Sequence, residues 1–376
     1  MRITIAQGPF LPVPPLLGGA IEKFFFPLAQ LWASAGHQVT HISRSYPGLA
    51  EHEVIGGVSH LRIPSRGSSP LASVNKLLDF AFAARVTRAL PPADILVSNT
   101  FFLPVLARAQ SRTGHLYIHA ARYPRGQMSL YRHAARLQVP SQAIAEAISE
   151  QSPSVSERIS VIPYALAELP HPFPQPIPAG PLRLLYVGRL HREKGVHLLL
   201  QALALLPAEI QAAFTMTLVG PHANSQGGSG EAYLSELRLQ ASGLTTPVTF
   251  SGPIFSAAEL AACYSKAQLF VYPSLADRGE TFGVAPLEAL SHGLPVLASA
   301  LPCFKDFLNE NNSIVFNHRS PAPANALASS LRHALSLLDR WPALSNAAFE
   351  TASRYTLSSV SQLMLTDFGK ILEEQK

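Results

Sequence analysis

The sequence predicts an α/β protein of two doubly wound domains, and three observations support this. The chain has 376 residues, more than the roughly 250–300 that one hydrophobic core usually holds. In both halves, short apolar runs alternate with amphipathic helical segments, a pattern typical of parallel sheets covered on both faces. A proline-rich stretch separates the two halves.

The first half, residues 1–163, opens as a strand-helix-strand unit. A β-branched run at 2–6 leads through a Gly/Pro loop to a helical stretch from about Ala20 to Ala35, and Gly36 introduces the strand QVTHIS. Further strands are expected from 95, 115 and 159, with helices at 71–90 and 141–151. This half is predicted to be an N-terminal Rossmann-like domain.

A linker is predicted at residues 164–181. Prolines at 170, 172, 174, 176, 178 and 181 exclude a helix or a central strand there and stiffen the chain. Beyond it, the runs LRLLYVG, FTMTLVG, VTFSG, LFVYP and PVLAS alternate with helical segments, which predicts a second doubly wound domain at 182–355. The last helix, in 356–376, has no strand after it, so we expect it to cross back to the first domain.

Composition limits the class of protein. Hydrophobic residues make up 47% and charged residues 14%, enough apolar material for two cores and no sign of disorder. No apolar run reaches the roughly 18 residues of a membrane span. The net charge of +5 is too diffuse to indicate nucleic-acid binding, although it permits attraction to anionic membranes or acidic substrates.

The expected location is cytoplasmic, with peripheral association at the inner face of the membrane left open. The N-terminus lacks the apolar core and cleavage site of a signal peptide. Cys263 and Cys303 form neither a disulfide framework nor a CxxC pair, which fits a reducing compartment.

The most informative segment is FVYPSLADRGETFGVAPLEALSHGLPVLAS, residues 270–299. Glu280 lies just before a predicted helix start, and Glu288 lies about one and a half turns inside the helix. Gly283 permits close backbone approach, and the free amides of the helix start can hold phosphate or sugar oxygens. In the alternative interpretation, both carboxylates are ordinary helix-surface groups.

A basic loop follows another predicted strand in YVGRLHREKGVHLLL, residues 186–200. Arg189 and Lys194 lie at the carboxyl end of that strand, where open α/β sheets bind ligands. A guanidinium and an ammonium suit a diphosphate. Surface cations on a loop are the alternative.

Three features of the first half are candidates for binding. Gly18 and Gly19 precede the first helix and can approach a phosphate, but they form neither a GxGxxG nor a GxxxxGK[ST] motif. A plain turn-forming diglycine is the alternative. His119 ends the strand HLYIH and is expected to face the crevice. The basic stretch 120–136 begins with Arg122 and Arg125, and it is either a patch for an acceptor or a membrane, or a solvated cationic face.

No metal or cofactor is expected. The chain contains no DxD pair, no HExxH and no spaced Cys/His cluster. Arg189, Lys194 and backbone amides would then balance the charge of a diphosphate.

The ordered set GG, H, GRLxxxKG, LVG, FxG, ExFGxxxLEA and GxPV resembles the retaining glycosyltransferases of family 4, the glycogen-synthase-like group. The resemblance covers nearly the whole chain, and ExFGxxxLEA with GRLxxxKG carries most of its weight. It implies the GT-B architecture, two Rossmann-like domains facing each other across a cleft.

The resemblance also implies roles for single residues. Arg189 and Lys194 would bind the donor diphosphate, Glu280 the transferred sugar and Glu288 the ribose. Ile254 matches a position near the nucleobase, and His119 matches the histidine beside the anomeric carbon. The remaining positions implied to contact the donor are Gly18, Gly19, Gly188, Thr281, Phe282, Gly283 and Val284.

The implied reaction transfers a sugar, with retention and without a metal, from a nucleotide donor to a glycan, lipid-linked or protein acceptor. The donor is expected to be a UDP-linked hexose or N-acetylhexosamine, and its diphosphate can itself accept the proton of the acceptor. The alternatives are a GT-B sugar-nucleotide epimerase and a non-catalytic nucleotide-sugar-binding partner. One departure from the family is Tyr164–Ala165, where an Asn/Gly pair is common.

Overall fold

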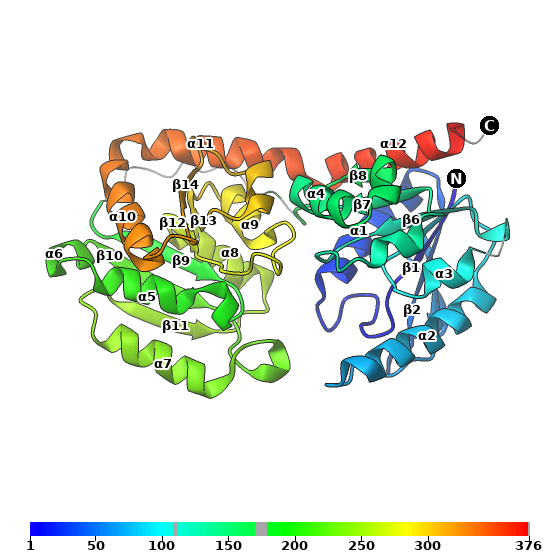
Figure 1. The fold of residues 1–376 in the computed structure, drawn as a ribbon, viewed down its shortest axis with the longest axis horizontal. Helices are drawn as coiled ribbons and strands as arrows, with labels where there is room; N and C mark the ends of the chain where they lie inside the picture. The colour runs from blue at the N-terminus through cyan, green and yellow to red at the C-terminus, as the bar shows by residue number, and fades with distance from the viewer. Residues whose placement is uncertain (109–110, 168, 170–178, 375–376) are drawn as a thin grey trace. The chain divides into compact units, whose positions relative to one another are not determined.

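A computed structural model describes residues 1–108, 111–167, 169 and 179–374. The chain forms two compact units: unit 1 is Met1–Ala167 with Leu357–Lys376, and unit 2 is Glu168–Thr356. Each unit is a doubly wound α/β domain (Figure 1), so the predicted fold class is confirmed. Most of the predicted linker lies outside the described residues.

The sheet of unit 1 has the order β3-β4-β2-β1-β5-β6-β7-β8. Neighbouring strands run parallel, as in the pairing of Ile3 with Val39, apart from the antiparallel pair β3 and β4. The strands are β1 (Arg2–Ala6), β2 (Gln38–Arg44), β3 (His52–Ile55), β4 (Val58–Ile63), β5 (Ile95–Ser98), β6 (His115–His119), β7 (Arg136–Val139) and β8 (Ile159–Val161).

Helices cover both faces of this sheet. A cluster that includes Phe82, Val86, Leu96 and Leu137 fills the face under α2, α3 and α4, and α1 packs with α12 on the strands. Burial of these apolar side chains is the main stabilising term of the unit. The helices are α1 (Ala20–Ser34), α2 (Ala72–Ala89), α3 (Leu103–Ala107), α4 (Gln142–Gln151) and α12 (Leu357–Glu373), with short 3₁₀ turns at η1 (Ser111–Thr113), η2 (Gln127–Tyr131) and η3 (Pro153–Arg158).

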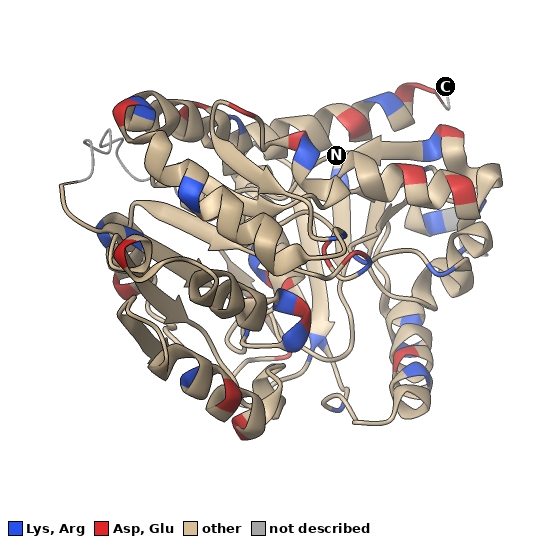
Figure 2. Cartoon of the chain, turned by 60° about the vertical axis from the view of Figure 1, so that its left-hand side comes forward, with Lys and Arg blue, Asp and Glu red and all other residues tan. Residues whose placement is uncertain are grey.

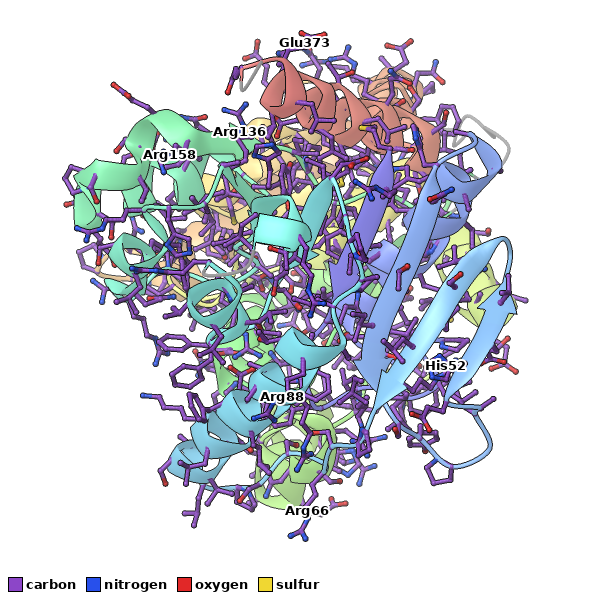
Figure 3. The ribbon with its side chains drawn as sticks, turned by 90° about the vertical axis from the view of Figure 1, so that its right-hand side faces the viewer. His52, Arg66, Arg88, Arg136, Arg158 and Glu373 are labelled. Atoms are coloured by element: carbon purple, nitrogen blue, oxygen red, sulfur yellow. The ribbon has the colours of Figure 1, made fainter. Side chains whose placement is uncertain are left out.

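The last helix, α12, belongs to unit 1, as expected from the sequence (Figure 1). Phe368 packs edge-on against Trp32 and Tyr117. The Tyr117 hydroxyl donates to Asp367 at 2.9 Å, and Arg136 forms an ion pair with Asp367 at 3.1 Å. Figure 3 shows Arg136 beneath this helix. Arg136 is therefore not part of a solvated cationic face, because it holds α12 on the sheet.

The sheet of unit 2 has the order β11-β10-β9-β12-β13-β14, with parallel pairing throughout the described strands. Helix α5 packs with α7 and α10, and α9 packs with α11. The strands are β9 (Leu182–Val187), β10 (Phe214–Val219), β11 (Val248–Gly252), β12 (Leu269–Tyr272), β13 (Val296–Ser299) and β14 (Ser313–Phe316). The helices are α5 (Val196–Ala204), α6 (Ala208–Gln211), α7 (Gly230–Ser242), α8 (Ala257–Lys266), α9 (Val284–Ser291), α10 (Pro323–Ser336) and α11 (Trp341–Ala352).

The strand order reverses beside the first strand of each unit. In unit 2, β9 lies between β10 and β12; in unit 1, β1 lies between β2 and β5. The chain thus winds outward in both directions from β9 and from β1. The loops that leave adjacent strands at such a point diverge and leave a crevice, which is the usual ligand site of an open α/β sheet.

Four strands were absent from the sequence-based prediction: β3, β4, β7 and β14. All four lie at or next to a sheet edge, where polar residues are tolerated, and β3, β7 and β14 have only four residues each. None of the helices in the described ranges is long and apolar enough to cross a membrane. Figure 2 shows both signs of charge interspersed over helices and loops.

Candidate functional site

Two loops of unit 2 meet through a buried ion pair. Lys194 ends the 3₁₀ turn η4 (Arg192–Lys194) after β9, and Glu280 lies in the loop after β12. The Lys194 ammonium donates to Oε1 of Glu280, and the two side chains are only 8% and 10% exposed. The hydroxyls of Tyr272 and Ser274 donate to the same oxygen at 2.8 and 3.3 Å. Three donors thus fix this carboxylate at the point where the strand order reverses.

Two stacked tyrosines, Tyr186 and Tyr272, lie next to the Lys194–Glu280 pair. The rings of Tyr186 and Tyr272 are 5.9 Å apart and nearly parallel, and the Lys194 ammonium lies 5.8 Å from the centre of the Tyr272 ring. Burial, followed by the Glu280 charge, raises the pKa of Tyr272 well above its usual range. Tyr272 therefore stays a neutral donor to Glu280 at physiological pH.

Glycine is required where the two loops touch. Gly195 has φ +70°, and a Cβ there would lie 1.9 Å from the carbonyl oxygen of Pro273. The amide of Leu275 donates to the carbonyl of Glu193 at 2.7 Å. The backbones after β9 and β12 are thus in direct contact, which brings Lys194 within reach of Glu280.

Arg189 lies beside the pair but has other partners. Its guanidinium is exposed and donates to the carbonyl of Gly227 at 2.9 Å and to Glu193 at 3.1 Å. Its own carbonyl accepts from the Tyr186 hydroxyl at 2.8 Å, and the preceding Gly188 amide pairs with the Val219 carbonyl. The backbone of Arg189 is fixed while its charge remains accessible to an anion.

The helix start after Glu280 has the form that the sequence predicted. Gly283, at φ +98°, is the N-cap of α9, and a Cβ there would lie 2.4 Å from the Phe304 ring. Phe282 is 1% exposed and packs against Phe307 and Tyr355. The Phe282 side chain is therefore part of the packing beneath the helix start and is not available to a ligand. Thr281 and Val284, on either side, are half-buried.

Glu288 lies on α9, and Ile254 lies in the loop after β11. Glu288 accepts from the Tyr264 hydroxyl at 3.1 Å, and Tyr264 stacks on His292 with ring centres 4.8 Å apart. Ile254 is half-buried in the loop after β11, and the next residue, Phe255, is 82% exposed. Phe255 was missed from the sequence, although an aromatic beside the predicted nucleobase position was visible there.

In unit 1, Gly18 and Gly19 end the loop after β1, at φ +78° and +96°, and Gly19 is the N-cap of α1. The Glu22 carboxylate lies against Gly19, since a Cβ there would lie 2.1 Å from its Oε2. Burial raises the pKa of Glu22, and Arg122 opposes that shift. Glu22 is a second residue that sequence reasoning missed. Its signal was an acidic residue three positions after an N-cap.

His119 does not face an open crevice, contrary to the expectation. It is 2% exposed, and its ring lies against Phe24 and Phe25. Nδ1 pairs with the Gln138 side-chain oxygen, and Nε2 lies 3.2 Å from the Tyr164 hydroxyl. Burial lowers the pKa of His119 to about 4. The ring is neutral, with Nδ1 donating to Gln138 and Nε2 accepting from Tyr164.

The basic stretch 120–136 divides between the two edges of the sheet. Arg122 and Arg125 are exposed in the loop at the carboxyl end of β6, whereas Arg136 starts β7 at the opposite edge.

Within unit 2, the structure brings together four of the predicted site residues: Gly188, Arg189, Lys194 and Glu280. Within unit 1, three others lie at the carboxyl edge of the sheet: Gly18, Gly19 and His119. No group of three His, Cys, Asp or Glu side chains in the described residues could hold a metal ion.

Two family models match the chain. The model described as "Glycosyl transferases group 1" matches residues 170–341, and the model described as "Glycosyl transferase 4-like domain" matches residues 19–165. Among curated relatives, a phosphatidyl-myo-inositol mannosyltransferase of Mycobacterium leprae is 33% identical over 185 residues, which are 48% of this chain and 45% of that protein. The chain spans less than half the length of the curated relatives it matches.

Solved structures are similar over the full chain. A sucrose-phosphate synthase from Thermosynechococcus elongatus has a TM-score of 0.81 at 20% identity, covering 100% of both chains. The Anabaena protein HepE in complex with UDP has a TM-score of 0.73 at 18% identity, covering 98% of this chain and 100% of that one. At these identities the likeness shows the fold.

Proposed function

Because the chain belongs to the family-4-like glycosyltransferases with the GT-B fold, we propose that it transfers a sugar from a nucleoside-diphosphate sugar. The proposed donor is a UDP-linked hexose or N-acetylhexosamine, and the proposed acceptor is a glycan, a lipid-linked sugar or a protein. The observation that carries the proposal is the buried Lys194–Glu280 pair, with the exposed Arg189 beside it, at the strand-order reversal of unit 2.

The donor diphosphate is assigned to Arg189 and Lys194. A lysine ammonium has three donors, so Lys194 can keep its bond to Glu280 and also bind a phosphate oxygen. Arg189 can exchange the Glu193 carboxylate for a second phosphate oxygen, because the exposed ion pair holds it weakly. The helix start at Gly283 adds backbone amides for the same anion. These groups would balance the diphosphate charge without a metal ion.

Glu280 is assigned to the hydroxyls of the transferred sugar. Its Oε1 is occupied by three donors, which is a poor arrangement for a covalent nucleophile and a good one for a fixed acceptor of hydrogen bonds. We propose that the bond from the anomeric carbon to the diphosphate breaks first and that the acceptor oxygen attacks from the same face. Attack on the face that the diphosphate leaves gives retention of configuration, and the leaving diphosphate takes the acceptor proton.

The remaining contacts with the donor and the acceptor are assigned to residues around this site. Glu288 is assigned to the ribose hydroxyls, and Ile254, with the exposed Phe255, to the nucleobase. The acceptor is assigned to unit 1, where Arg122 and Arg125 are exposed at the carboxyl edge of the sheet. Two free cysteines fit a cytoplasmic protein, and a lipid-linked acceptor would add peripheral membrane association.

The test begins with thermal shift in the presence of EDTA. UDP, GDP and ADP are compared, each with its glucose, N-acetylglucosamine and mannose conjugates, on the wild type and on Arg189→Ala. Arg192→Ala is the matched control, since Arg192 is also exposed and pairs with a glutamate, Glu236. Stabilisation by one nucleotide set that is lost only in Arg189→Ala supports the assignment, and no stabilisation by any nucleotide contradicts it.

Turnover separates the proposed reaction from its alternatives. Release of the nucleoside diphosphate that depends on an added acceptor, with retained anomeric configuration by NMR, is the expected result. Conversion of the donor sugar without any acceptor would indicate an epimerase. Donor binding with no turnover across an acceptor screen would indicate a binding partner.

A further inference from the structure

The loop between β1 and α1, residues 7–19, has more backbone acceptors than donors. Positions 9, 12, 14 and 15 are proline and have no amide hydrogen. Two bonds form within the loop, from Leu16 to the Pro14 carbonyl at 2.8 Å and from Gly18 to the Pro15 carbonyl at 3.0 Å. Since buried carbonyls require donors, the first part of the loop needs donors from outside it.

Two arginines supply those donors. Arg62, near the end of β4, is fully buried and donates to the Val13 carbonyl through Nη2 at 3.0 Å and Nε at 3.3 Å. Arg44 ends β2, and its Nη1 donates to the Phe10 carbonyl at 2.7 Å. The two arginines come from adjacent parallel strands, because Ser43 is the register partner of Arg62.

Arg62 is itself fixed on its far side. It forms an ion pair with Glu53 on β3 and donates to the Ala50 carbonyl. A fully buried guanidinium is retained only where its charge and its donors are satisfied. The hydrogen bonds from Arg62 to the Val13 carbonyl hold the loop. These bonds also offset part of the free-energy cost of burying the guanidinium.

The held segment leads directly to Gly18 and Gly19. Val13 is fully buried, while Leu16 and Leu17, a few residues on, are 58% and 53% exposed. A Cβ at Gly19 would lie 2.6 Å from the Leu11 side chain, so the end of the loop packs against the segment that contains Phe10 and Val13. The place of the Gly18 and Gly19 amides therefore depends on where Phe10 and Val13 are held.

We propose that Arg44 and Arg62 are positioning residues for sugar transfer, holding the loop that presents Gly18 and Gly19 to the reacting groups. This inference rests on the proposed function. Neither arginine contacts the substrate in this scheme, because each acts through a backbone carbonyl of the loop. Loss of either contact would displace the loop amides, and a displacement near 1 Å can cost about a hundredfold in rate.

The test compares Arg44→Met and Arg62→Lys with Arg85→Met. Arg85 is a matched control, because its Nη1 donates to the Pro64 carbonyl at 2.7 Å in the same unit and outside the loop. Methionine keeps an apolar stem and removes the donors. Arg44 is half-buried at a strand end, so its variant is expected to fold even if Arg62→Lys does not.

The expected result is a fall of about ten- to a hundredfold in kcat for Arg44→Met. The thermal shift given by UDP is expected to fall far less than kcat, because unit 2 is proposed to supply most of the UDP contacts. A purely structural effect would instead lower the melting temperature and the UDP shift together. Transfer by Arg44→Met at the rate of Arg85→Met would overturn the inference.

Hydrogen exchange of the backbone amides tests the inference independently of sugar transfer. Loop amides in 7–19 are expected to exchange at least about tenfold faster in Arg44→Met than in Arg85→Met. Unchanged protection would overturn the inference, whatever the activity. If the wild type shows no transfer with any donor, the proposed function fails, and the exchange result still decides whether the arginines hold the loop.

Discussion

Lys194 and Glu280 are 86 residues apart in sequence, and their side chains form a hydrogen-bonded ion pair that is almost entirely buried. The pair exists because β9 and β12 are adjacent in the sheet and because Gly195 lets the two following loops touch. Replacing one partner of an ion pair at this depth costs much stability, because the charge that remains is buried without a counter-charge or water.

Removal of one partner is expected to cost both stability and activity. Lys194→Met should destabilise the protein by about 3 kcal/mol and reduce transfer by roughly a hundredfold or more. Glu280→Gln should lose less stability than Lys194→Met, because an amide oxygen still accepts from Lys194 and Tyr272, yet it should also lose transfer. Thermal unfolding and initial rates measure the two effects. Wild-type rates in Glu280→Gln would contradict the assignment of this residue to the sugar.

Arg189→Ala should separate binding from stability. Arg189 is exposed and its ion pair with Glu193 is a surface contact, so the loss of stability should be under about 1 kcal/mol. The stabilisation given by UDP should disappear, because the guanidinium is the accessible charge beside the pair. The measurement is the melting temperature with and without UDP. A UDP shift equal to that of Arg192→Ala would contradict the prediction.

Acid should destabilise the fold through buried histidines. Burial lowers the pKa of His41 to about 3 and that of His60 and His119 to about 4, and Arg62 adds to the first two shifts. Each ring is neutral when folded and takes up a proton on unfolding below pH 6.5. Stability is therefore complete above that pH and falls as the pH drops toward 4.

The expected loss between pH 7 and pH 5 is about 2 kcal/mol for each of these histidines. His41→Phe keeps a ring in the stack with His60 and removes one titrating group, so its loss should be smaller by about that amount. His52→Gln is the control, because this side chain is exposed on the edge strand β3 (Figure 3). Urea unfolding at both pH values checks the prediction, and equal losses in wild type and His41→Phe would contradict it.

Two glycine-to-alanine changes should act in opposite directions. Gly195→Ala places a Cβ against the Pro273 carbonyl in a left-handed conformation and should destabilise by about 3 kcal/mol. Gly369→Ala lies in α12 with open space around its Cβ and should stabilise by about 0.5–1 kcal/mol. Differential scanning calorimetry measures both. A neutral Gly195→Ala would show that the contact between the loops is dispensable.

Asp367→Ala should loosen the last helix. It leaves Arg136, which is 13% exposed, without its buried partner and should cost about 3 kcal/mol. Glu374→Ala removes the other, 60% exposed, partner of Arg136 and should cost less than about 0.5 kcal/mol. Limited proteolysis that cleaves within α12 in Asp367→Ala alone is the expected observation.

The sequence predicted the order of strands and helices well because each long element carries a clear apolar period. Helices α1, α5 and α12 and strands β1, β9 and β12 all follow from that signal. The short edge strands β3 and β14 were not predicted, because apolar and polar residues alternate too weakly in them to distinguish them from loops. Edge positions need little burial, so the pattern that reveals central strands is missing.

The sequence motifs of the site could be predicted, but the contacts between their side chains could not. Spacing placed Lys194 and Glu280 each after a strand, but only the sheet order β9–β12 brings them together. The burial of His119 under Tyr164 and Gln138 depends on side chains from two other parts of the chain. The Glu22 carboxylate over Gly19 was visible only as a capping position.

Unit 1 is made from the two ends of the chain. Tyr117 and Asp367, which hold α12 in place, are 250 residues apart. During synthesis on a ribosome, the whole of unit 2 emerges before α12 can complete the unit that was made first. Until then, the surface that Trp32 and Tyr117 present to Phe368 is uncovered. The domain whose synthesis begins first is thus completed only after unit 2 has been made.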